Sequence, residues 1–162
     1  MLVRLAAGLA LALVLWWAFR LSMGLRWNKV QRERLREEEA GRGRIVAELP
    51  LPEGMAFFVE EAAAFRWGGE AIARGAVRGA RLLLNSAVVA SVERPGAALP
   101  PPPAPEDEPG RERWEVMAYL DGGAAHIVRC GSVREGISRQ AARAVFDALR
   151  AACAAAPGEE RA

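Results

Sequence analysis

The chain opens with an unbroken apolar run from Leu5 to Phe19, bracketed by Arg4 and Arg20. Extended outward to residues 2–25, this stretch is long enough to cross a hydrocarbon core of about 30 Å as a helix. The flanking arginines can lay their stems along apolar surface and place their charged ends among the lipid headgroups. We therefore expect a transmembrane anchor over residues 1–25, with membrane contacts from Leu5, Leu9, Leu13, Trp16, Trp17 and Phe19.

Two other interpretations of this segment are less favoured by the pattern. A cleaved signal peptide would use Arg4 as its basic end and Ser22-Met23-Gly24 as a small-x-small cleavage site. However, Arg20 and the bulky side chains before it stand where such a peptide becomes small and polar. A buried core helix is disfavoured because a domain of this size has little interior for a helix that is apolar all round. The pattern favours an uncleaved anchor.

Basic residues are unevenly distributed around the anchor. Only the amino group and Arg4 precede it, whereas it is followed by Arg20, Arg26, Lys29, Arg32, Arg34 and Arg36. Lysine and arginine close to a membrane helix mark the cytoplasmic side. The sequence therefore predicts a single-pass protein of the cell inner membrane, with its N-terminus outside and its C-terminal domain in the cytoplasm.

Residues 26–44 form a charged connector. Residues 28–40 are good helix formers, but the apolar Trp27, Val30 and Leu35 are too sparse for a coiled-coil seam. We expect a solvated juxtamembrane helix that ends near Gly41. A short homodimeric stalk is one functional alternative. Anionic-lipid contact is another, and its candidate residues are Arg20, Arg26, Lys29 and Arg32.

The remaining chain predicts one α+β domain over residues 45–156, followed by a disordered tail at 157–162. Strands are expected at 45–49, 57–59, 65–67 and 72–79, although residues 60–64 have helical propensity. Tight hairpins are expected around Asn85 and around Asp121-Gly122-Gly123. A Pro-rich solvated loop at 95–113 separates them. An amphipathic helix should open at Ser138 as N-cap and run to about Ala155.

Six or seven antiparallel strands followed by one amphipathic helix is the layout of a pleckstrin-homology-like barrel. We therefore expect either such a barrel or an open antiparallel sheet, closed by the C-terminal helix. No signature residues accompany the layout, so it identifies no family, and this fold alone would leave the function open.

The sequence contains few residues that could form a catalytic site or bind a metal or a cofactor. His126 is the only histidine, and Cys130 would lie about 13 Å away along a strand, too far for a nucleophilic pair. Cys130 and Cys153 are the only cysteines, too few for a zinc site and expected to be reduced and buried. An enzyme is the weakest of the three functional hypotheses for this chain, because it would require Asp121, His126 and Cys130 to lie close together. We predict no catalytic residue, no metal and no cofactor.

Two surfaces are candidates for binding. The turn before the last helix brings together backbone donors and the side chains Ser132, Arg134, Ser138 and Arg139, which suits an anion or a partner. Glycine in this turn is better explained by the change from strand to helix. Trp67 and Trp114 are candidate exposed aromatics for an interface.

The sequence therefore predicts a membrane-anchored, non-enzymatic interaction or scaffolding protein, an accessory subunit of a membrane-associated assembly. Its partners would be membrane lipids and another protein, with a homo-oligomer left open. The net charge of +2 is too small to indicate nucleic acid. The alternative function is recognition of an anionic lipid or a phosphorylated ligand at the inner membrane surface.

Overall fold

The computed structural model describes residues 16, 30–51, 54–102, 104, 112–131 and 137–155. The chain divides into two compact units, Met1–Glu38 and Glu39–Ala162. Residues 30–40 are helical, as the connector pattern predicts. Within the described part of the chain, no helix is both long and apolar enough to cross a membrane. Apart from Trp16, the expected anchor at 1–25 lies outside that part.

The second unit begins with a four-stranded antiparallel meander, sheet A. Its strands lie in the order β1-β2-β3-β4. Their bounds are β1 Arg44–Leu51, β2 Gly54–Glu60, β3 Ala64–Trp67 and β4 Glu70–Ala73. Residues 61–63 form a tight connection, closed by the Glu61 amide donating to the Ala64 carbonyl at 2.9 Å. The hairpin therefore overrides the helical propensity of residues 60–64.

A second antiparallel sheet, sheet B, has the strand order β6-β5-β7-β8. Its strands are β5 Val77–Leu84, β6 Ala87–Glu93, β7 Trp114–Leu120 and β8 Ala125–Arg129. Both predicted hairpins are present. Asn85 and Ser86 take φ values of 50° and 65°, as a two-residue turn of type I′ needs. Residues 121–123 form the other turn, the 3-10 element η2 Asp121–Gly123.

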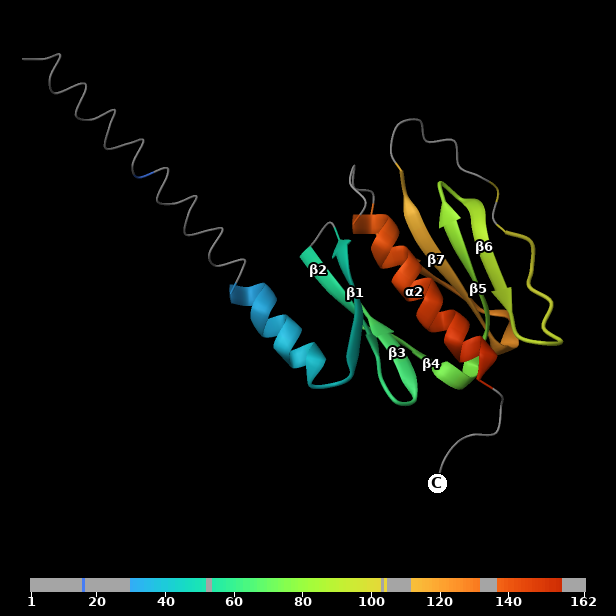
Figure 1. The fold of residues 1–162 in the computed structure, drawn as a ribbon, viewed down its shortest axis with the longest axis horizontal. Coiled ribbons are helices and arrows are strands. Elements are labelled where there is room, and N and C mark those ends of the chain that lie inside the picture. The colour runs from blue at the N-terminus through green and yellow to red at the C-terminus, as the bar shows by residue number, and fades with distance from the viewer. Residues whose placement is uncertain are drawn as a thin grey trace, which may run out of the picture. The chain divides into compact units, whose positions relative to one another are not determined.

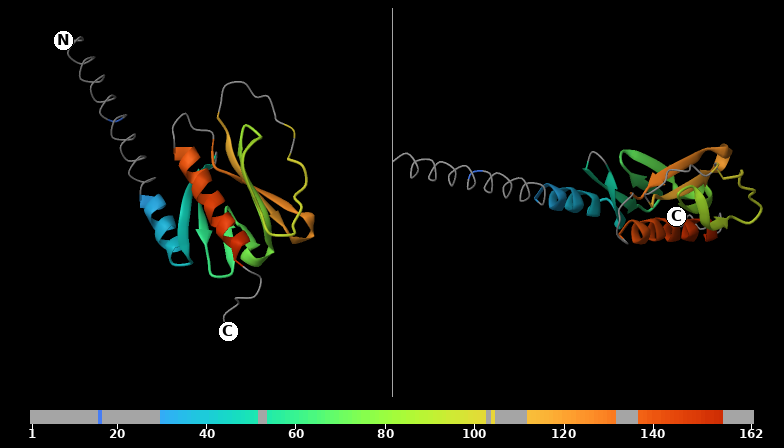
Figure 2. Two further views of the ribbon diagram at one scale, coloured as in Figure 1. Left: turned by 45° about the vertical axis from the view of Figure 1, so that its right-hand side comes forward. Right: turned by 90° about the horizontal axis from the view of Figure 1, so that it is seen from above.

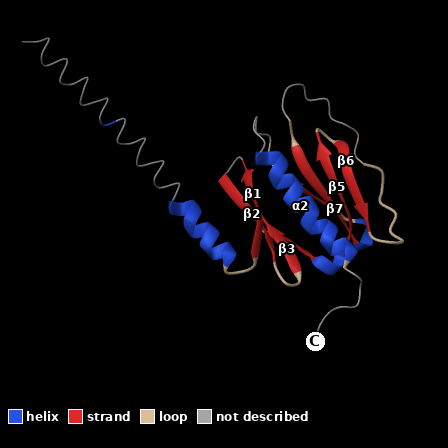
Figure 3. Cartoon of the chain, viewed as in Figure 1, coloured by secondary structure: helices blue, strands red, loops and turns tan. Residues whose placement is uncertain are grey.

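The α+β prediction and the C-terminal helix are confirmed, but a closed barrel is wrong (Figures 1 and 3). Eight described strands form two separate four-stranded sheets instead of six or seven strands in one. The difference arises at residues 72–79, where the sequence suggested a single strand. A 3-10 turn, η1 Arg74–Ala76, interrupts that stretch, so β4 ends in sheet A and β5 begins sheet B.

The C-terminal helix, α2 Ile137–Ala154, joins the two sheets into one core. It packs against β1 of sheet A and against β5, β6 and β7 of sheet B. Figure 2 shows it forming one layer, with the strands as the other. Its fully buried side chains include Ala142, Val145 and Leu149, which have the spacing of one helical face. On sheet A, the Phe58 ring stacks on Phe65 and on Trp67, each at 5.5 Å between centroids.

Ser138 is not the N-cap that the sequence suggested. The helix begins one residue earlier, at Ile137, so Ser138 lies inside its first turn. The side chain is completely buried, and its hydroxyl has no hydrogen-bond partner among the described residues. The difference follows from packing, because the buried face of α2 already begins in its first turn.

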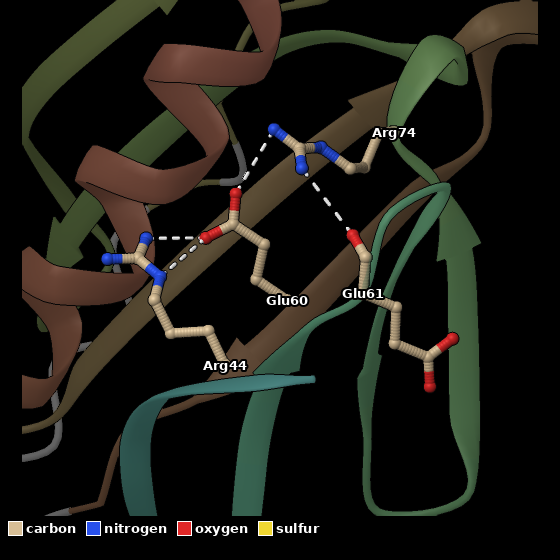
Figure 4. Close-up of polar contacts among 4 residues, drawn as sticks. All are labelled: Arg44, Glu60, Glu61 and Arg74. Atoms are coloured by element: carbon tan, nitrogen blue, oxygen red, sulfur yellow. Dashed lines mark hydrogen bonds and ion pairs between the residues drawn. The ribbon is translucent and has the colours of Figure 1, made fainter. Parts of the chain in front are cut away.

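A polar cluster secures the junction between sheet A and η1 (Figure 4). Arg44 Nε, at the start of β1, donates to Glu60 Oε2 at 3.0 Å, and Arg74 Nη2 lies 3.1 Å from Glu60 Oε1. Arg74 also donates to the Glu61 carbonyl at 3.4 Å and lies over the Phe65 ring. The cluster ties β1, the end of β2 and η1 together, so its charges serve the fold.

Candidate functional site

Sheet B is covered on both faces, which sets it apart from an ordinary half-exposed sheet. Its inner face joins the main core through Ala80, Leu82, Val116, Ala118 and Val128. On the opposite face, which we call the outer face, Leu83, Met117 and Tyr119 form a second apolar cluster. Leu99, from the loop that follows β6, packs against this cluster. The first part of the Pro-rich loop is therefore held on the sheet, whereas the sequence predicted a plain solvated loop.

Arg81 fixes this loop to the outer face. Its side chain is buried, and its Nη1 donates to the Pro100 carbonyl at 2.6 Å and to the Tyr119 hydroxyl at 2.9 Å. The guanidinium also lies over the Tyr119 ring, 5.1 Å from its centroid. A buried guanidinium needs such partners because desolvation of a charge is costly. Arg81 and Leu99 therefore act together to position residues 99 and 100 on the sheet.

Gly79 lets Leu99 approach the sheet closely, and its replacement by alanine should therefore be destabilising. A Cβ at this position would lie 2.7 Å from the Val92 carbonyl oxygen and 2.8 Å from both Leu99 methyl carbons. We expect Gly79→Ala to lower the free energy of unfolding by about 1–3 kcal/mol, measured by urea denaturation. Gly75→Ala is the matched control, since a Cβ there meets nothing within 4 Å. Equal stability of the two variants would contradict this packing.

A groove of about 370 Å³ lies on the same outer face of sheet B. Its apolar lining comes from Leu83, Met117 and Ile127 on the sheet and Ala104 on the loop. Its polar lining comes from Ser86, Arg113, Glu115 and Arg129. The register explains the arrangement, because Met117 pairs with Ile127 and Glu115 pairs with Arg129. We call this feature the sheet B groove.

The polar end of the groove carries two arginines around one carboxylate. Glu115, whose side chain is only 9% exposed, lies 3.4 Å from Arg113 Nε and 4.0 Å from Arg129 Nε. Arg113 is further fixed by donating to Ser86 Oγ at 3.1 Å, and its backbone amide donates to Asn85 Oδ1 at 2.7 Å. The Arg129 side chain, in contrast, is 77% exposed.

The residues considered for catalysis have separate partners. His126 Nδ1 lies 3.2 Å from Glu70 Oε2, and its ring meets the Trp67 ring edge-on. Asp121 forms an ion pair with Arg78 at 3.1 Å. Cys130 is buried, with its thiol 3.6 Å from the Val128 carbonyl. His126 therefore bridges β8 to β4, at the junction of the two sheets.

Both cysteines are free and buried, as expected. Burial, assisted by the negative charge of Glu115, raises the pKa of Cys130 to about 12. Burial also raises the pKa of the Cys153 thiol, against a smaller opposing effect from Arg94. Neither group is a thiolate at neutral pH, and the thiolate is the reactive form of cysteine. Among the residues that the structure describes, no three histidine, cysteine or acidic side chains gather as a metal site.

Several predicted contact residues lie outside the described part of the chain. These are the anchor residues Leu5, Leu9, Leu13, Trp17 and Phe19, the lipid candidates Arg20, Arg26 and Lys29, and the turn residues Ser132 and Arg134. Arg32 is exposed on the helix at 30–40, and Arg139 is exposed on α2. Ser138 is fully buried. The described residues therefore provide no assembled anion site at this turn.

Trp67 and Trp114 are not the exposed aromatics that the sequence suggested. They are 7% and 6% exposed, and both belong to the main core. The exposed large hydrophobic residue beside the groove is instead Ile127, at 45%. Sequence reasoning missed Ile127, Arg113 and Arg129, although the alternation in β7 already placed Glu115 and Met117 on a common face.

Comparisons with protein-family models, with curated proteins and with solved structures find no match to this chain.

Proposed function

We propose that this chain is a single-pass membrane-anchored, non-enzymatic interaction protein, an accessory subunit of a membrane-associated assembly. Its folded unit would act in the cytoplasm, at the inner membrane surface, and bind a protein partner through the sheet B groove. The observation that carries the proposal is the groove itself, whose lining includes the half-exposed Ile127 and the exposed Arg129. The anchor and its orientation rest on the apolar run at 5–19 and the basic residues that follow it.

The composition of the groove favours a protein partner. Methionine and arginine are enriched in the centres of protein interfaces, and arginine is frequent among the residues that dominate binding energy. Met117 is buried at the floor, and Ile127 is half-exposed beside it. On the same face, Leu99 already covers Met117 and Tyr119 from one side. A partner side chain packed on Ile127 would bury more of the apolar surface of this face, part of which Leu99 already covers.

Photo-crosslinking in cells tests this function. A photoreactive amino acid at Ile127 is expected to yield one discrete crosslinked protein band in carbonate-washed membranes. The matched control position is Val89, which is also half-exposed and lies on the opposite edge strand of sheet B, outside the groove lining. The Val89 probe is expected to give no such band. The same bands from both positions, or none from Ile127, would contradict the proposal.

A further inference from the structure

Sheet B ends at β8 in an edge that differs from the other edge strands of the described chain. β1 contains Pro50 and a register shift between Ile45 and Ala47. β6 has a register shift opposite Leu82 and Leu83, and β4 is only four residues long. Proline, a bulge or a short length keeps an edge strand from pairing with another chain. β8 pairs with β7 in unbroken register over its five residues and contains no proline.

The hydrogen bonds between β7 and β8 show which backbone groups of β8 point outward. The Leu120 amide donates to the Ala124 carbonyl at 2.8 Å, and the Cys130 amide donates to the Trp114 carbonyl at 2.9 Å, both in the register of this hairpin. In an antiparallel pair, alternate residues exchange both backbone hydrogen bonds with the residue opposite, and the residues between them face away. The even-numbered residues of β8 therefore bond to β7, and its odd-numbered residues face outward.

The outward-facing residues of β8 are Ala125, Ile127 and Arg129, and all three are exposed. Among the described residues, no backbone hydrogen bond from a turn or loop reaches them. Their N–H and C=O groups repeat along the edge at every second residue, about 6.8 Å apart. An extended peptide presents complementary C=O and N–H groups at the same repeat, whereas an acyl chain has none.

We propose that the protein partner adds an extended segment to the edge of sheet B as a fifth strand, hydrogen-bonded to Ala125, Ile127 and Arg129. This inference rests on the proposed function, because it describes how the same partner binds. Ile127 and Arg129 also line the sheet B groove, so the added strand runs along its border. The partner side chain opposite Ile127 covers the exposed part of that residue as a cross-strand neighbour. Since backbone groups make the contacts, the segment needs β-propensity more than a fixed charge.

A peptide scan tests the inference on the full-length chain in lipid nanodiscs. The probe is a linear seven-residue peptide, selected from a random phage library on this sample and then synthesised with one N-methyl group at each position in turn. N-methylation removes one backbone donor, so an added strand should be sensitive only at every second residue. We expect about a tenfold loss of affinity where the N–H faces β8, and less than about a threefold loss at the positions between.

Ala125→Pro tests the same bonds from the side of the protein. It removes an outward donor and no bond to β7, and Ala124 already has the extended conformation that precedes proline, with φ −67° and ψ 145°. The matched control is Ser91→Pro on β6, where the Arg94 amide donates to the Arg78 carbonyl, so that Ser91 faces outward by the same alternation. Ala125→Pro should weaken peptide binding about tenfold, and Ser91→Pro should leave it unchanged. Both variants should keep the wild-type unfolding temperature.

The inference and the proposed function fail in different ways. Equal sensitivity at all peptide positions, or at none, would exclude an added strand, and so would a library that yields no peptide above empty nanodiscs. Equal affinities of Ala125→Pro and Ser91→Pro would exclude β8 as the edge that pairs. A crosslinked band from Ile127 at twice the mass of the chain would assign the edge to a second copy. Loss of crosslinking at Ile127 would instead overturn the proposed function itself.

Discussion

Replacement of Phe58 by alanine is expected to lower the free energy of unfolding by about 3–5 kcal/mol. Phe58 is completely buried, and its ring stacks on both Phe65 and Trp67. Alanine would remove these contacts and leave a cavity in sheet A that the paired strands cannot readily close, because β2 is bonded to β1 and β3 on either side. Small domains have total stabilities of only about 5–15 kcal/mol, so the variant should be close to unfolding. Urea denaturation monitored by tryptophan fluorescence and by circular dichroism measures the loss.

Val89→Ala provides the comparison for Phe58→Ala. Val89 is a half-exposed apolar residue of β6, so its truncation should change the free energy of unfolding by no more than about 0.5 kcal/mol. A loss below 1 kcal/mol for Phe58→Ala would show that the aromatic stack does not form the centre of the core.

The strands and turns could be predicted from the sequence where local residue preferences determine the conformation. Asn85-Ser86 between two apolar runs and Asp121-Gly122-Gly123 each predicted a hairpin that the structure contains. The apolar positions of α2 follow the helical period and were placed on its buried face. Propensity misled at residues 60–64, where pairing of β2 with β3 decided the conformation.

The division into two sheets could not be predicted from the sequence, because it depends on a three-residue turn. Nothing in Arg74-Gly75-Ala76 distinguishes a continuous strand from a 3-10 turn, since glycine and alanine tolerate both. The turn is fixed by tertiary contacts, in particular by Arg74 binding Glu60 of β2. A barrel and a pair of sheets therefore share almost the same local sequence pattern.

The groove was also hidden from the sequence, for a related reason. Leu99 and Ala104 come from a Pro-rich loop whose composition indicates solvent exposure. The docking of Leu99 depends on Arg81 and Tyr119, which meet only after β5 pairs with β7. Arg113, Glu115 and Arg129 look like ordinary surface charges until strand register gathers them. Trp67 and Trp114 were wrongly predicted to be exposed because the burial of an aromatic side chain cannot be deduced from the sequence alone.

The largest functional effect is expected from Ile127→Asp. A carboxylate at this position would put a charge on the apolar floor of the sheet B groove, so partner binding would require its desolvation. It would also compete for Arg129, two residues away on the same face. We expect the amount of partner retained to fall at least tenfold, which corresponds to about 1.4 kcal/mol of binding free energy. The fold should tolerate the change, because the Ile127 side chain is 45% exposed.

The most direct test of partner binding by the sheet B groove is co-purification from cells of the protein that crosslinks at Ile127, using full-length wild type, Ile127→Asp and Val89→Asp. Val89 is 50% exposed and lies on the other edge strand, so the two variants introduce the same charge at equally accessible positions of sheet B. Equal thermal unfolding temperatures would establish that both remain folded. Ile127→Asp should lose the partner, and Val89→Asp should retain it. Retention by both variants would contradict a binding role for the groove, and so would equal loss.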